Sequence, residues 1–98
     1  MNMELKELIE RQGPWHVSVI QYGITHSVMR LALHHGYYPD HQELVCGDTI
    51  EFTGLLQGGP YTLTLEPDPE VAGGLMIRDA RDKLRIRTMR LELAPAQR

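Results

Sequence analysis

Two glutamates, Glu51 and Glu66, are the residues whose spacing comes nearest to catalytic chemistry. They flank the run Gln57-Gly58-Gly59-Pro60, and a Gly-Gly pair suits the two-residue turn of a β-hairpin because both central positions need positive φ. A hairpin with that turn places Glu51 directly opposite Glu66. Two facing carboxylates can split their pKa values and serve as acid and base in a small hydrolase. We favour the other interpretation, a solvated sheet face on which basic residues form salt bridges with these acids.

Basic residues are concentrated near the C-terminus. The chain has ten Lys and Arg against thirteen Asp and Glu, a net charge of −3, yet most of the basic residues follow Ile77. Every second residue at the start of the last expected strand is basic: Lys83, Arg85 and Arg87. Their side chains therefore share one face, where they form either a row that pairs with the acids or a row that binds a partner. Such a row could follow the phosphates of single-stranded nucleic acid, but the pI near 5.9 disfavours nucleic acid as a partner.

Histidines provide a weaker metal hypothesis. His16 lies opposite His34 in the first expected hairpin, close enough for the two rings to share a metal ion. Zinc would need a third ligand, for which the sequence offers His26, Asp40, His41 or Cys46 without selecting one. We therefore expect solvated histidines and no metal. The sequence also lacks a phosphate-binding glycine loop and a dinucleotide fingerprint, so we expect no cofactor.

Two further features concern a candidate contact surface for a partner and a candidate residue of the hydrophobic core. Tyr37 and Tyr38 are adjacent in a loop, where tyrosine is a good contact residue for a protein partner, although it can equally cap the end of a sheet core. Cys46 shares the alternation of Leu44 and Ile50, so we interpret it as a small buried residue rather than a nucleophile.

These side chains must be positioned by one helix and several hairpins. Leu5, Leu8 and Ile9 recur at helical spacing, and Gly13-Pro14 ends the pattern, which predicts a helix over about residues 3–12. The strands that follow are expected as three successive hairpins. The first pairs Val17 with Leu33 and Val19 with Leu31, the second turns at Gly58-Gly59, and the third pairs Ile77 with Leu84 and Leu75 with Ile86.

This layout leaves one alternative open and includes one irregularity. Residues 25–35 also fit a helix capped by Thr25 or Ser27 and ended by Gly36. In the last strand the apolar residues switch from even to odd positions near Arg87-Thr88. A β-bulge there would keep them all on the core face.

The predicted fold is α+β and mainly antiparallel β. The helix and roughly six strands form a curled sheet, a small sandwich or an open barrel. We expect one domain over residues 1–98, with 94–98 as a frayed tail. The layout resembles small bacterial β-rich domains, some of which are immunity proteins that neutralise toxins. That resemblance concerns the fold alone.

Composition limits the class of function. No apolar run is long enough to span a membrane, and a lone cysteine cannot form an internal disulfide, so we expect a cytoplasmic protein. The absence of catalytic signatures favours a small non-enzymatic interaction domain, like an immunity protein, inhibitor or adaptor, with a protein partner or a second copy of itself. The alternatives are the hydrolase using Glu51 and Glu66, and an OB-like nucleic-acid binder using the basic strand.

Overall fold

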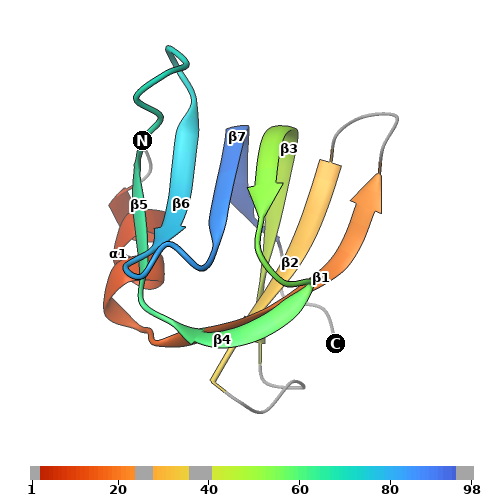
Figure 1. Ribbon diagram of the computed structural model, residues 1–98, viewed down its shortest axis with the longest axis vertical. Coiled ribbons are helices and arrows are strands. Elements are labelled where there is room, and N and C mark those ends of the chain that lie inside the picture. The colour runs from red at the N-terminus through yellow and green to blue at the C-terminus, as the bar shows by residue number, and fades with distance from the viewer. Residues whose placement is uncertain (1–2, 24–27, 36–40, 95–98) are drawn as a thin grey trace.

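The computed structural model describes residues 3–23, 28–35 and 41–94, and within them the chain forms one helix and seven antiparallel strands (Figure 1). This confirms the predicted α+β, mainly antiparallel class. The elements, in chain order, are α1 (Met3–Arg11), β1 (Trp15–Gly23), β2 (Val28–His34), β3 (His41–Thr53), β4 (Gln57–Tyr61), β5 (Leu63–Pro67), β6 (Leu75–Asp79) and β7 (Arg85–Leu93). The seven strands make one sheet in the order β4-β1-β2-β3-β7-β6-β5.

The sheet curls into a half-barrel because of the way β4 connects to β5. These strands occupy opposite ends of the strand order, yet only Thr62 separates them in the chain. Their edges must therefore approach each other, and β4 crosses one end of the half-barrel (Figure 1). The core lies inside the curl, where Trp15, Leu31 and Leu65 are buried together with Ile9 of the helix. The indole Nε1 of Trp15 donates to the carbonyl oxygen of Ile9 at 2.9 Å and so ties α1 to β1.

The first predicted hairpin is confirmed. Val17 pairs with Leu33 and Val19 with Leu31, and the register shifts between Val19 and Gln21. The segment from Val28 is a strand and not a helix. Met29, Leu31 and Leu33 recur at every second position and are all buried in the core, which fits the period of a strand paired with β1. The capping residues of the helical alternative lie outside the described residues.

The second predicted hairpin is wrong. Gly58 and Gly59 lie inside strand β4, which pairs with β1, while β3 pairs with β2 and β7. Gly59 allows a close approach of β4 to β1. A Cβ added at Gly59 would lie 2.8 Å from the Cα of His16 and 2.9 Å from the carbonyl oxygen of Trp15. Any side chain there would push β4 away from β1.

The third hairpin exists, but its register differs from the prediction. Ile77 pairs with Ile86 rather than with Leu84, because the turn is longer than two residues. Asp79 closes it: its backbone N–H donates to Leu84, and its carboxylate accepts from the backbone N–H of Arg81. The core alternation predicted for the hairpin is retained.

Two smaller predictions need correction. The register shift expected at Arg87-Thr88 lies on the neighbouring strand β3, between Thr49 and Glu51. The tail expected from residue 94 does not begin at Ala94, whose N–H donates to the carbonyl oxygen of Glu43 at 2.8 Å. Residues 95–98 lie outside the described residues.

Candidate functional site

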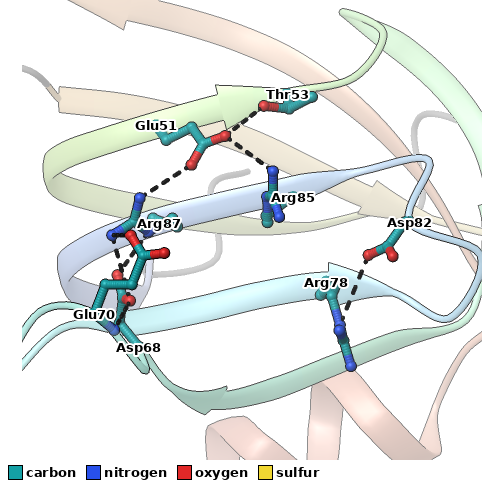
Figure 2. A network of polar contacts seen from close by, with 8 residues as sticks. All are labelled: Glu51, Thr53, Asp68, Glu70, Arg78, Asp82, Arg85 and Arg87. Atoms are coloured by element: carbon teal, nitrogen blue, oxygen red, sulfur yellow. Dashed lines mark hydrogen bonds and ion pairs between the residues drawn. The ribbon is translucent and has the colours of Figure 1, made fainter.

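Arg87 is the centre of the charged face of the sheet (Figure 2). Its Nε donates to Asp68 at 2.8 Å, one terminal nitrogen lies 3.2 Å from Glu51, and the other lies 3.3 Å from Glu70. Arg85 reaches the second oxygen of Glu51 at 3.4 Å. The acidic residues on β3 and after β5 therefore meet the basic residues of β7.

Electrostatics hold this cluster in its ionised form. The hydrogen bond from Arg87 keeps the pKa of Asp68 below its usual value, and the hydroxyl of Thr53 followed by Arg87 does the same for Glu51. Asp68, and then Glu51, raise the pKa of Arg87. A carboxylate kept ionised by fixed cations is a poor general acid. These ion pairs connect β3, β7 and the loop after β5 and so have a structural role.

The carboxylate pair proposed for a hydrolase is not formed. Glu51 lies on β3 and Glu66 on β5, and β7 and β6 run between them, so the two are about 14 Å apart along the sheet. Glu66 instead lies 3.6 Å from Arg78 of the adjacent strand. The hydrolase hypothesis loses its geometric premise, because it depended on the Gly58-Gly59 turn.

The three predicted basic binding residues also separate. Arg85 and Arg87 bind carboxylates of this chain, whereas Lys83 lies outside β7, on the exposed loop between β6 and β7. They do not form one free row, which removes the feature that suggested a path for phosphates. Lys83 lines a cavity with Arg81 instead.

His16 and His34 face each other as expected, with stacked rings whose centroids are 5.6 Å apart. His34 is buried, and its Nε2 lies 3.1 Å from the hydroxyl of Ser18. Burial is the main cause that lowers the pKa of His34, followed by the neighbouring histidines His16, His41 and His35. Within the described part of the chain, no three His, Cys, Asp or Glu residues are arranged to hold a metal ion. The two other candidate ligands, His26 and Asp40, are not among the described residues.

Cys46 is buried as expected, and burial raises its pKa to about 12. Such a thiol stays protonated and is a poor nucleophile. Tyr37 and Tyr38 lie outside the described residues, so their contact role stays a prediction.

The outer edge of β1 is a feature that the sequence interpretation did not locate. The ladder to β4 ends at Ser18, and one further bond joins the N–H of Val19 to the carbonyl oxygen of Leu56 at 2.8 Å. Beyond it, no described residue pairs with the outer side of residues 20–23. Ile20 and Tyr22 there are 42% and 51% exposed. The available signal was the complete lack of Lys, Arg, Asp and Glu in Trp15–Gly23.

The opposite edge of the sheet, β5, lies against α1. Lys6 donates to the carbonyl oxygen of Leu65 at 2.9 Å, and the N–H of Leu65 donates to Glu10 at 2.9 Å. Lys6 and Glu10 also pair with each other. One turn of helix therefore satisfies both backbone groups that Leu65 would otherwise present to a further strand.

Comparison of the chain with protein-family models, with curated proteins and with solved structures finds no match. No helix in the described ranges is long and apolar enough to cross a membrane. The function must therefore be argued from the geometry of the chain itself.

Proposed function

We propose that the protein is a small non-enzymatic interaction domain that self-associates through the outer edge of β1, with a second copy of the chain as its partner. The observation that carries this proposal is the length of β1 beyond Val19, whose outer side has no pairing strand among the described residues. Unpaired backbone groups at a sheet edge are a template for a further strand.

The chemistry of this edge suits a second copy. A twofold axis brings the same strand of each copy together antiparallel, so each residue meets the residue at the symmetric position across the axis, which belongs to the same strand. Like charges facing each other would oppose such pairing. Because Trp15–Gly23 contains no Lys, Arg, Asp or Glu, two neutral edges can approach without that cost.

Apolar side chains beside the edge would add contact area. Tyr22 and Ile20 lie on the edge itself, and Leu56, which bonds to Val19, is also strongly exposed. Exposed apolar groups gathered at one place mark interaction surfaces more often than isolated ones do. Main-chain hydrogen bonds would give the pairing its direction, and these side chains would contribute affinity.

Sedimentation of the full chain across concentrations up to the millimolar range tests the proposal. We expect a reversible dimer, and we expect Tyr22→Lys or Ile20→Lys to shift the protein to monomer by placing a charge at the twofold contact. Ile50→Lys is the matched control, since Ile50 is 44% exposed but lies on β3 between Thr49 and Glu51, which pair with β7 and not with β1. A wild-type chain that is monomeric throughout, or a Tyr22→Lys variant that dimerises as well as Ile50→Lys, would overturn it.

We place this association in the cytoplasm. The support is the single cysteine, which is free and buried in the core rather than bridged. Free buried thiols are typical of proteins in a reducing compartment. Microscopy of the full chain carrying a fluorescent tag would test the location.

A further inference from the structure

A cavity of about 730 Å³ opens at the end of the half-barrel that β4 crosses. Its walls come from the residue before β1, from the segment between β3 and β4, from β4 itself and from the loop between β6 and β7. They include Pro14, Leu55, Pro60 and Tyr61. Pockets of roughly 300–1,000 Å³ are typical for small ligands. None of the interactions described above uses this space.

Asp79 fixes the shape of the cavity. One carboxylate oxygen accepts from the N–H of Thr62 at 3.0 Å, and the other accepts from the N–H groups of Arg81 and Lys83 at 3.2 and 3.3 Å. The N–H of Ala80 donates to the carbonyl oxygen of Thr62 at 2.9 Å. The β6–β7 loop is thereby tied to the junction of β4 and β5, and the lone pairs of Asp79 are directed at this backbone.

The side chains left to face the cavity are mainly donors. Arg81 and Lys83 line it and are exposed, and no described residue forms an ion pair with either side chain. Tyr61 is buried, and burial together with the Asp79 carboxylate raises the pKa of its hydroxyl, so the hydroxyl keeps its proton. No hydrogen bond joins that hydroxyl to the rest of the described chain.

Charge and shape together indicate the class of ligand. Two cations exceed the single acid, Asp79, so the cavity carries a net positive charge. Pro14, Leu55 and Pro60 give it an apolar side that an ion alone would leave unfilled. We propose that this cavity binds a small molecule in which one carboxylate or phosphate group, held by Arg81 and Lys83, is attached to an apolar ring or chain that packs against the prolines.

Titration of the full chain with phenyl phosphate, benzoate and phenol, followed by amide NMR spectra, tests this proposal. We expect phenyl phosphate or benzoate to shift the amide signals of Thr62, Arg81 and Lys83, and we expect phenol to bind much more weakly. The stronger of the two anions identifies which acid group the site prefers. The Arg81→Gln/Lys83→Gln double variant should bind at least about tenfold more weakly, because it loses hydrogen bonds to a charged group.

Two further variants keep the test interpretable. Arg11→Gln is the matched control, since Arg11 is an exposed cation on α1 that does not line the cavity, and it should leave the affinity unchanged. Tyr61→Phe removes only the hydroxyl and should weaken binding by a smaller factor. The proposal is overturned if neither anion shifts these signals, if phenol binds as tightly as the anions, or if the double variant binds like Arg11→Gln. None of these three outcomes depends on whether the chain dimerises.

Discussion

At one edge of the sheet, β5 runs beside α1, and Lys6 and Glu10 bond both backbone groups of Leu65 (Figure 1). At the other edge, β4 covers β1 only as far as Val19 and leaves residues 20–23 without a pairing strand among the described residues. Both edges belong to the same sheet and carry the same kind of backbone groups. They differ in what the chain places beside them.

The difference separates stability from association. A covered edge adds buried contacts inside one molecule, so changes there should be measured as free energy of unfolding. An uncovered edge has few contacts to lose, so changes there should affect pairing with another chain and leave unfolding nearly unchanged. Variants at the two edges should therefore be distinguished by which measurement responds.

The largest expected effect comes from removing the packing of α1. Ile9 is completely buried in the core, and Ile9→Ala should lower the free energy of unfolding by about 2–4 kcal/mol, measured by urea denaturation. Loss of the helix would also uncover β5, so this variant should aggregate more readily. Met3→Ala, on the exposed side of α1, is the control and should change stability by less than about 0.5 kcal/mol. Equal effects of the two variants would show that α1 does not hold the β5 edge.

A slightly smaller effect is expected where β4 covers β1. Gly59 has a φ of 130°, and a Cβ there would collide with the backbone of β1, so Gly59→Ala should cost about 2–3 kcal/mol. By loosening β4 it should lengthen the open edge and strengthen self-association. Gly73→Ala separates the two causes, since Gly73 also has positive φ, at 80°, but its Cβ would meet only Met89 at 3.8 Å. A cost for Gly59→Ala no larger than for Gly73→Ala would contradict the close approach of the strands.

Gly59 also shows where the sequence was insufficient. A Gly-Gly pair satisfies a tight turn and a close strand crossing equally well, because both require a missing Cβ. Helical spacing correctly predicted the helix, and local alternation correctly predicted the pairing of Val17 with Leu33 and the burial of Cys46. The pairing of β3 with β7 joins residues far apart in the chain, and no local pattern specifies such a partner.

The candidate sites depended on that long-range pairing. The predicted hairpin placed Glu51 opposite Glu66. In the observed strand order Glu51 instead lies beside Arg87 and forms an ion pair with it. The charge pattern did predict that acidic and basic residues neutralise each other on one face. The open edge of β1 became visible only when the end of β4 was known, because an unpaired strand is defined by its missing neighbour.

At the covered edge, Glu10→Gln should lower the free energy of unfolding by about 1 kcal/mol at neutral pH. Lys6, and then the N–H of Leu65, hold the pKa of Glu10 below its ordinary value of 4.5. The contribution of the carboxylate is therefore complete above pH 4.5 and is lost as the pH falls through the lower pKa of the folded state. Urea denaturation at several pH values should show the wild type and the variant converging below pH 4.5.

The matched control for this prediction is Glu7→Gln. Glu7 is exposed on the same helix, and among the described residues it forms an ion pair only with Arg11, at 3.8 Å. Its replacement should change stability by less than about 0.5 kcal/mol at any pH. A similar response of the two variants would mean that the bond to the β5 backbone adds nothing beyond an ordinary surface charge.

The smallest effect is expected at the end of β1 that β4 covers, where His34 of β2 faces His16 of β1. Burial, and then the neighbouring histidines, lower the pKa of His34 below its ordinary value of 6.5. Its neutral form therefore contributes stability that is complete above pH 6.5 and is lost as the pH falls through the lower pKa of the folded state. His34→Gln should flatten the dependence of unfolding free energy on pH in that window while leaving the Glu10 window unchanged. A slope that persists in the variant would assign it to other histidines, and the β1–β2 pair would then not be distinguishable from the β5 edge by pH.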